Sequence, residues 1–175
     1  RPGQVNYASV GVGSGTHLVG VLFSLASGTE MTHVPYKGIQ QAAPDLAGGQ
    51  VHLTFNAIGP LAGFLQSGKL KLLASTAPTR MARYPDLPTV AESGLPGFDA
   101  AGWYGFFAPA RTPREILAKL NAEIVKALGT RDLADKIEAG ALLPAPQSLA
   151  EAERFVQREA EKWSRAVKAS GARAD

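Results

Sequence analysis

Cysteine is absent from the 175 residues of the chain, which excludes disulfides, thiolate metal sites and cysteine nucleophiles. No apolar run approaches the roughly 20 residues that a membrane-spanning helix requires. A signal-peptide pattern is missing too, since residues 1–7 are polar and lead directly into a strand-like segment. The three histidines show neither HxxxH spacing nor an acidic companion motif, so we expect no metal site and no cofactor.

Positive charge is in small excess. The chain has 18 Lys and Arg residues against 15 Asp and Glu residues, which gives a net charge of +3 and a pI near 9.3. The densest basic stretches, at Lys69/Lys71 and Arg80/Arg83, lack the interleaved aromatic residues of a nucleic-acid surface. We therefore expect no nucleic-acid partner and interpret the excess mainly as a solubility feature, although it also suits a small anionic ligand.

The first hundred residues alternate between strand-like and helix-like patterns, with glycines at several segment ends. This rhythm predicts an α/β fold in which helices cover a parallel sheet. The expected strands are residues 5–10, 31–36, 51–55 and 70–76, and the expected helices are residues 16–26, 40–47 and 61–66.

A long proline-rich connection follows at residues 77–96, and such loops are usually functional or tied down elsewhere. An aromatic-rich strand is expected at residues 101–109, and only helices after it. Their starts are indicated by capping boxes, in which a Ser or Thr and a Glu three residues later satisfy the first N–H groups. These boxes are Thr112/Glu115 and Ser148/Glu151, with a shorter helix near residues 132–139 between them. The connection itself carries a third box, Thr89/Glu92, which predicts one short helical turn ended by Gly94.

The helical tail makes a poor independent domain. One strand and three amphipathic helices carry apolar stripes that need a sheet to cover. We therefore expect residues 101–175 to belong to a lobe whose other strands lie outside this chain, with the boundary near residue 100. The exposed stripes also predict self-association of the chain through residues 101–175.

The strongest local signal for a binding site is the glycine-rich segment between the first strand and the first helix. Gly11, Gly13 and Gly15 let the backbone approach a ligand, and a helix N-terminus presents free N–H donors. Ser14 and Thr16 add hydroxyl groups, so the segment suits a carboxylate or phosphate oxygen. It lacks GxGxxG spacing and the Lys-Ser/Thr of a P-loop. An ordinary turn with Ser14 or Thr16 as N-cap explains the pattern equally well.

Further polar residues follow the other expected strands. Tyr36, Lys37 and Gly38 follow the second strand, Asn56 follows the third, and residues 75–76 end the fourth. The carboxyl ends of parallel strands share one edge, where open α/β sheets bind ligands. Each residue taken singly is more often structural, and only the shared edge groups them into a site.

An enzymatic interpretation has little support. Ser14 and His17 imitate a nucleophile–base pair, but the chain has no GxSxG elbow and no third group. His17 is more simply a residue of the helix start. His33 and His52 lie inside expected strands, where we interpret them as structural. We therefore expect a binding protein without catalytic residues.

Six segments carry a resemblance to a known family. In order they read VNYASVGVGSGTHL, THVPYKG, LAGGQVHLTFN, GKLKLLAST, PDLPTVAESGLPGF and WYGFFAPARTP. They resemble the Bug/TctC-type receptors of tripartite tricarboxylate transporters, and the similarity runs across essentially all 175 residues. The resemblance implies a type II periplasmic binding protein, located in the periplasm. Its two lobes would close around a small carboxylate and deliver it to membrane permease subunits.

The resemblance also implies an organisation and a site. Residues 1–100 would be the second, ligand-facing α/β lobe. Residues 101–175 would supply the strand and helices that complete a first lobe, whose N-terminal half is absent from the chain. Ligand contacts would come from the glycine loop and helix start, from the second loop and from the residue after the third strand. These residues are Gly13, Ser14, Gly15, Thr16, His17, Tyr36, Lys37, Gly38 and Asn56.

Two departures from the family pattern matter. The family usually has glycines and then proline after Tyr-Lys/Arg-Gly, whereas here Ile39-Gln40-Gln41 follow and Pro44 falls inside the expected helix. The family often has aspartate where this chain has Asn56, and a neutral amide cannot pair with an ammonium ion. We therefore expect a ligand without an obligatory amino group. The alternative function is an effector-sensing domain of a transcriptional regulator, which would need a DNA-binding module upstream.

Overall fold

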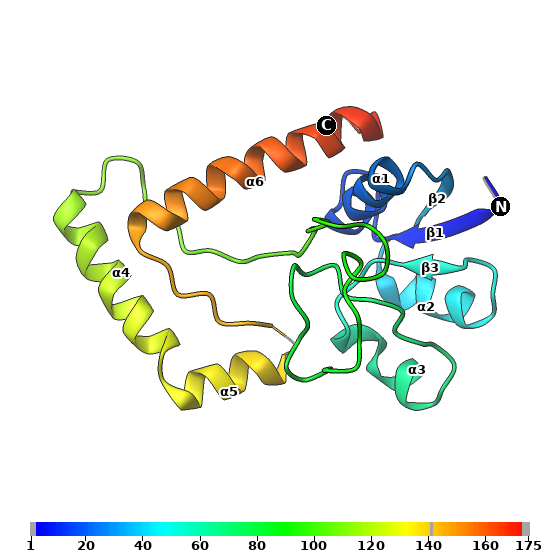
Figure 1. Ribbon diagram of the computed structural model, residues 1–175, viewed down its shortest axis with the longest axis horizontal. Helices are drawn as coiled ribbons and strands as arrows, with labels where there is room; N and C mark the ends of the chain where they lie inside the picture. Colours follow the sequence, from blue (N-terminus) through cyan, green and yellow to red (C-terminus); the bar gives the residue numbers. More distant parts are fainter. Residues whose placement is uncertain (1–2, 141, 173–175) are drawn as a thin grey trace. The chain divides into compact units, whose positions relative to one another are not determined.

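The structure, a computed structural model, describes residues 3–140 and 142–172. Its N-terminal part contains three parallel strands in the order β2-β1-β3, and a helix connects each pair of consecutive strands (Figure 1). The expected α/β architecture with a parallel sheet is confirmed. The elements are β1 (Val5–Ser9), α1 (Gly15–Ser27), β2 (Met31–Pro35), α2 (Ile39–Ala47), β3 (Leu53–Thr54), the 3-10 turn η1 (Gly59–Leu61) and α3 (Ala62–Gln66).

Helices α1 and α2 cover opposite faces of the sheet. Alternate residues of a strand point to opposite faces. Tyr7 of β1 therefore lies toward α1, and its hydroxyl donates to the carbonyl oxygen of His17 at 3.4 Å. Its neighbour Ala8 is fully buried in a core shared with Ile39 and Ala42 of α2. The sheet is thus the middle layer between two helical layers.

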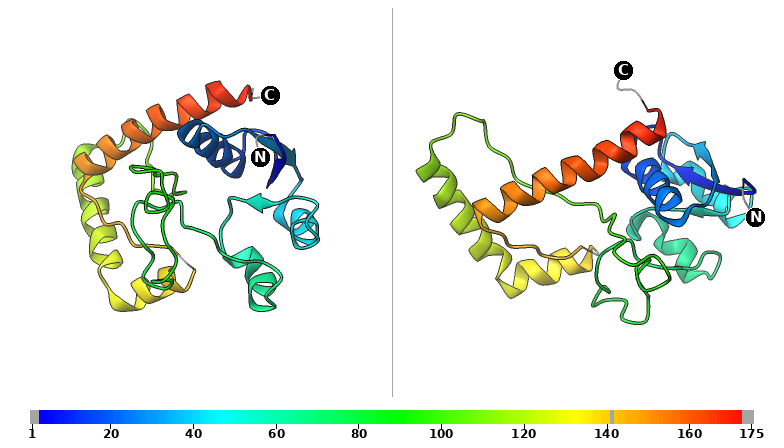
Figure 2. Two further views of the ribbon diagram at one scale, coloured as in Figure 1. Left: turned by 45° about the vertical axis from the view of Figure 1, so that its right-hand side comes forward. Right: turned by 45° about the horizontal axis from the view of Figure 1, so that its top comes forward.

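A second core lies on the α1 face of the sheet. It gathers side chains from α1 and from the connection that follows the sheet: Val19, Val90, Phe98 and Ala100. Trp163 of α6 (Leu149–Ser170) packs against this core, so the C-terminal end of that helix lies beside α1 (Figure 2). The described residues up to Gly102 and from Trp163 onward form one compact unit.

The long connection is tied to this unit by hydrogen bonds. Ser75 forms a parallel bridge with Thr89, and its N–H donates to the Pro88 carbonyl oxygen at 2.8 Å. The Thr89 N–H donates to the Glu92 carboxylate at 2.8 Å, and the Glu92 N–H donates to the Thr89 hydroxyl at 3.1 Å. The predicted capping box is therefore confirmed, although the residues after it form turns and not a helix.

Two of the expected strands do not form. Residues 70–76 carry only the single bridge at Ser75, and residues 101–109 have no strand structure. A strand needs a neighbour that satisfies its N–H and C=O groups. Within the described part of the chain, no segment pairs along either stretch. Both predictions were wrong because β-propensity reports how well a residue fits a sheet and says nothing of whether a partner strand is there.

Residues from Trp103 to Lys162 form a second compact unit, which is helical. It contains α4 (Arg114–Leu128), α5 (Arg131–Ala139) and the first part of α6, close to the expected helices.

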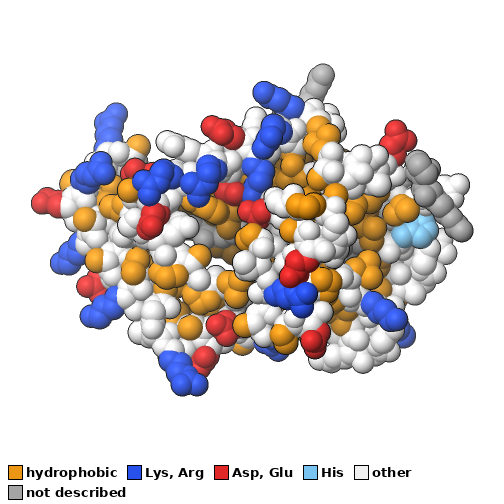
Figure 3. Space-filling view, in the orientation of Figure 1, with side chains coloured by type: hydrophobic (Ala, Val, Ile, Leu, Met, Phe, Trp, Pro, Cys, Tyr) orange, Lys and Arg blue, Asp and Glu red, His pale blue; other side chains and the backbone are white. Residues whose placement is uncertain are grey.

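None of the helices in the described ranges is long and apolar enough to cross a membrane. On the face seen in Figure 3, basic side chains lie among acidic ones and form no continuous stripe.

The capping boxes predicted for the tail have different outcomes. At the start of α6, the Glu151 carboxylate accepts from the Ser148 N–H at 2.8 Å and from the Ser148 hydroxyl at 2.6 Å, so this box is confirmed. The box at Thr112 was wrong. Helix α4 begins one residue later than expected, with Pro113 as N-cap and no side-chain hydrogen bond at that position. Proline has a fixed φ suited to a helix entry but offers no side-chain acceptor.

Candidate functional site

The candidate site is the carboxyl rim of the sheet, defined here as residues 10–17, 36–38 and 56. Its first loop turns sharply at Gly11 and Gly13, whose φ angles of 127° and 75° suit glycine. A Cβ built on Gly11 would lie 3.9 Å from the carbonyl oxygen of Tyr36. The loop after β1 therefore runs close to the end of β2, as the shared edge of parallel strands predicts.

The hydroxyl groups of the first loop are used within the loop itself. Ser14 is the N-cap of α1, and its hydroxyl donates to the Gly11 carbonyl oxygen at 2.7 Å and accepts from the His17 N–H at 3.3 Å. Thr16 Oγ1 accepts from the Val10 N–H and lies 3.0 Å from Ser14 Oγ, so its hydrogen is directed to Ser14. The first two helical N–H groups, those of Gly15 and Thr16, are among the rim donors that have no acceptor among the described residues.

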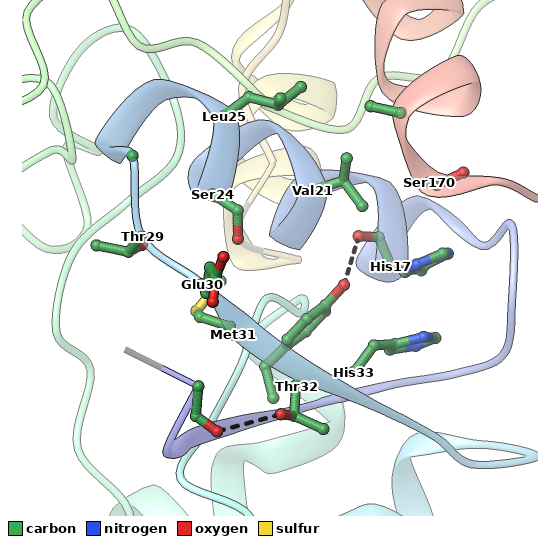
Figure 4. Close-up of a pocket in the computed structure, with 14 residues that line it drawn as sticks. His17, Val21, Ser24, Leu25, Thr29, Glu30, Met31, Thr32, His33 and Ser170 are labelled. Atoms are coloured by element: carbon green, nitrogen blue, oxygen red, sulfur yellow. Dashed lines mark hydrogen bonds between the residues drawn. The ribbon is translucent and has the colours of Figure 1, made fainter. Parts of the chain in front are cut away.

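Two histidines hold this loop from the α1 side of the sheet. His17 is 5% exposed, and its Nδ1 accepts from the Gly13 N–H at 3.0 Å. Its ring stacks on that of His33, with centroids 3.9 Å apart and planes 11° from parallel (Figure 4). His33 Nε2 lies 2.6 Å from Ser9 Oγ. The same hydroxyl bonds the N–H and the carbonyl oxygen of Gly11, each at 3.1 Å.

His33 is not among the residues predicted for the site, because a histidine inside a strand is usually structural. Two signals together could have found it. His33 pairs with Tyr7 in the ladder and so shares the α1 face with it, whereas Val34 packs against the α2 core. Alternation along β2, combined with the strand order, places the His33 ring beside the start of α1.

Both imidazoles are neutral at neutral pH. Burial lowers the pKa of His17 below its ordinary 6.5. Burial, together with the charge of a protonated His17, lowers the pKa of His33 to about 4. In the unfolded chain these two histidines therefore bind protons near pH 6.5, where in the folded chain they bind fewer. The stability that depends on this pair is complete above pH 6.5 and is lost as the pH falls toward 4.

The second loop contributes backbone more than side chains. The Tyr36 N–H donates to the Ser9 carbonyl oxygen at 3.0 Å, but its hydroxyl is directed to α2, where it donates to Asp45 Oδ2 at 2.8 Å. This hydrogen bond raises the pKa of Tyr36. Lys37 is exposed, and Gly38 has an extended backbone that any residue could adopt. Only the Tyr36 backbone is brought against the glycine loop.

Asn56 follows β3 by two residues and lies on the edge shared with the other loops. Its amide nitrogen Nδ2 is buried, and no hydrogen-bond partner reaches it from the residues that the structure describes. Leaving a buried amide N–H without an acceptor costs about 1–3 kcal/mol. A bound acceptor would remove this cost, so Asn56 offers a polar group well suited to a ligand.

A groove of about 620 Å³ lies beside the rim, between α1, the edge strand β2 and the end of α6 (Figure 4). Its lining includes Val21 and Ser24 of α1, Thr32 of β2 and Ser170 of α6. It reaches the rim only at His17. The groove is therefore lined in part by the histidine pair but is not the predicted ligand site.

The parallel sheet between two helical layers is an α/β fold, and solved structures similar to this chain are periplasmic binding proteins. A family model described as the tripartite tricarboxylate transporter family receptor matches residues 1–172, and the chain belongs to this family. The resemblance read from the sequence is confirmed.

Relatives and solved structures cover nearly the whole chain. BugT of Bordetella pertussis is 32% identical over 173 residues, which are 99% of this chain and 53% of BugT. A Rhodopseudomonas palustris protein solved with adipate is 35% identical with a TM-score of 0.78, covering 98% of this chain and 57% of that one. MatC of the same organism, with bound malate, is 33% identical with a TM-score of 0.70, covering 94% and 57%. The chain spans about half the length of the curated relatives it matches.

Proposed function

We propose that this chain is part of a periplasmic solute receptor that binds a small dicarboxylate at the rim and delivers it to the permease of a tripartite transporter. The observation that carries the proposal is a set of three unused donors at the rim: the first two helical N–H groups of α1 and the buried Asn56 Nδ2. Adipate and malate, bound by two similar proteins, are both dicarboxylates. The positive end of a helix and a free amide donor suit such anions.

Each part of the rim has a role in this proposal. The backbone at Gly13 and Gly15 and the N–H of Thr16 face one carboxylate, with Ser14 and His17 fixing the loop. Tyr36, Lys37 and Gly38 form the second side of the site, where the Lys37 ammonium is exposed and adds positive charge. Asn56 donates from the third side. Binding of this kind is a closure of lobes around the ligand and includes no bond-making step.

The class of ligand follows from Asn56. Its amide can donate to a carboxylate or hydroxyl oxygen, but it has no charge with which to hold an ammonium group. We therefore infer a ligand in which an amino group is not required. The full-length protein should be stabilised more by a dicarboxylate such as adipate than by an amino acid of similar size.

A charge placed at position 56 tests this assignment. In the full-length protein, Asn56→Asp should weaken adipate binding about tenfold or more, since two carboxylates would face each other, and tenfold corresponds to about 1.4 kcal/mol. Isothermal calorimetry at pH 7 measures the change. Gln50→Glu is the matched control, because Gln50 is exposed and precedes β3 at the opposite edge of the sheet.

Two outcomes would count against the proposal. Equal affinities in Asn56→Asp and Gln50→Glu would remove Asn56 from the site. If no mono-, di- or tricarboxylate raised the melting temperature of the full-length protein, the receptor function itself would fail.

A further inference from the structure

The glycine loop is fixed at two points, and each point depends on a histidine. At the first, His17 Nδ1 accepts the N–H of Gly13. At the second, Ser9 Oγ bonds both backbone polar groups of Gly11 and lies 2.6 Å from His33 Nε2. The loop leads straight into the first turn of α1. The two histidines therefore fix the backbone from which the rim's N–H donors extend.

The two imidazoles also depend on each other. Their centroids are 3.9 Å apart and their planes 11° from parallel, so each ring covers one face of the other. A charge on either ring would lie against its neighbour, and a like charge nearby opposes protonation of the second ring. Because His17 Nδ1 is the acceptor for the Gly13 N–H, a proton on that atom removes the hydrogen bond directly.

Within residues 3–140 and 142–172, no buried counter-charge faces a protonated pair. Tyr7 of β1 stacks on His33 with centroids 5.1 Å apart, and burial raises the pKa of Tyr7 to about 12, so it stays neutral. The glycine loop and α1 contain no charged residue. The last turn of α6 carries Lys168, which does not line the groove. Among the described residues of the groove lining, Glu30 is the only carboxylate, and it is exposed before the start of β2 (Figure 4).

We propose that His17 and His33 are positioning residues that hold the glycine loop in its carboxylate-binding conformation only while both rings are neutral, so that acid releases the ligand. This inference rests on the proposed function. The expected change of affinity with pH is opposite to the change that direct attraction would give. A protonated imidazole that contacted a carboxylate would tighten binding as the pH falls. The direction of the pH dependence therefore separates a positioning role from direct ligand contact.

The first test measures adipate binding to the full-length protein by calorimetry between pH 8 and pH 4.5. Affinity should fall about tenfold for each pH unit below the titration point of the pair. The variants His17→Asn and His33→Gln keep a hydrogen-bonding atom near Nδ1 and Nε2 but cannot titrate. In the double variant, whatever its affinity at pH 7, the pH dependence of binding should be only that of adipate itself.

His52 provides the matched control. It is exposed, and its Nδ1 accepts from the Asn6 N–H at 2.9 Å, so His52→Asn removes an imidazole ring from the opposite edge of the sheet. This variant should keep the wild-type pH profile. A double variant at positions 17 and 33 with the wild-type profile would overturn the inference. So would a wild-type affinity that rises in acid and depends on His17. Failure of the proposed function looks different, because adipate and other dicarboxylates would then not bind at pH 7.

A second measurement needs no ligand. In nuclear magnetic resonance spectra of the ligand-free protein, the Gly13 amide should shift with the same midpoint as the His17 ring, because protonation removes their hydrogen bond. The same shift should be unchanged in the His52→Asn variant. A Gly13 amide that does not respond while His17 titrates would refute the anchoring role, whatever the protein binds.

Discussion

The two compact units differ in what they bury. Every buried apolar residue in the described ranges belongs to the first unit, where side chains fill cores on both faces of the sheet. In the described part of the second unit the only buried residue is Glu159, which accepts from the Trp103 indole N–H at 3.1 Å. Nearby, Phe106 is 86% exposed.

The difference shows what a sheet does for a helix. Helices α1 and α2 have a sheet to cover, so their apolar faces are buried, whereas the described part of the second unit has no sheet for α4 and α5 to cover. Most of the stability of a short helix comes from such packing and little from propensity. The apolar side chains that the second unit exposes motivate two predictions. Residues 101–175 are expected to belong to another lobe, and the chain is expected to self-associate through them.

The largest expected effect compares one phenylalanine from each unit. Phe98→Ala should lower the free energy of unfolding by about 3–5 kcal/mol, because Phe98 is 8% exposed in the second core. Phe106→Ala should change it by less than about 0.5 kcal/mol. Urea unfolding of the chain measures both. Equal losses would mean that the second unit is as well packed as the first. Sedimentation of the Phe106→Ala chain would show reduced self-association.

A smaller effect compares two helical glycines. A Cβ on Gly20 of α1 would overlap the Tyr7 ring, lying 2.6 Å from its Cζ, whereas a Cβ on Gly63 of α3 would have nothing within 4 Å. Gly20→Ala should therefore cost about 1–3 kcal/mol through overpacking. Gly63→Ala should add about 0.5–1 kcal/mol, because alanine loses less backbone freedom in a helix. Thermal unfolding distinguishes the two, and a stabilising Gly20→Ala would show that α1 does not sit tightly on the sheet.

The smallest effect compares two caps in the tail. Ser148→Ala should cost about 1 kcal/mol, since it removes two hydrogen bonds to Glu151. Thr112→Ala should be nearly neutral, because α4 has no side-chain cap. Amide hydrogen exchange in the first turns of α4 and α6 measures each change. A large loss of protection in α4 would restore Thr112 as a cap.

The sequence predicts best where the signal is local. Alternation and glycine stops predict the three parallel strands and their helices, and the Ser–Glu spacing at Ser148 predicts the start of α6. Prediction from the sequence fails where a strand needs a neighbouring strand to form. Residues 70–76 and 101–109 have strand-like composition, but the described part of the chain contains no neighbouring strand that pairs along them.

The candidate site shows the same division. The sequence predicts the glycine loop and Asn56 as neighbours on one edge, because parallel strands end together. It cannot predict that the Ser14 and Thr16 hydroxyl hydrogens are used inside the loop, since that depends on local rotamers. Nor does it reveal the contact between His17 and His33, which joins residues 16 positions apart through the register of β2.

Pro35, the last residue of β2, affects how strands of other molecules can pair with this edge of the sheet. The Tyr36 N–H points to β1, so the nitrogen of Pro35 points to the outer edge of the sheet. Proline has no hydrogen there, and no ladder bond is lost. A strand from another molecule would find one donor missing on an edge only five residues long. This edge is therefore a poor template for aggregation by strand addition.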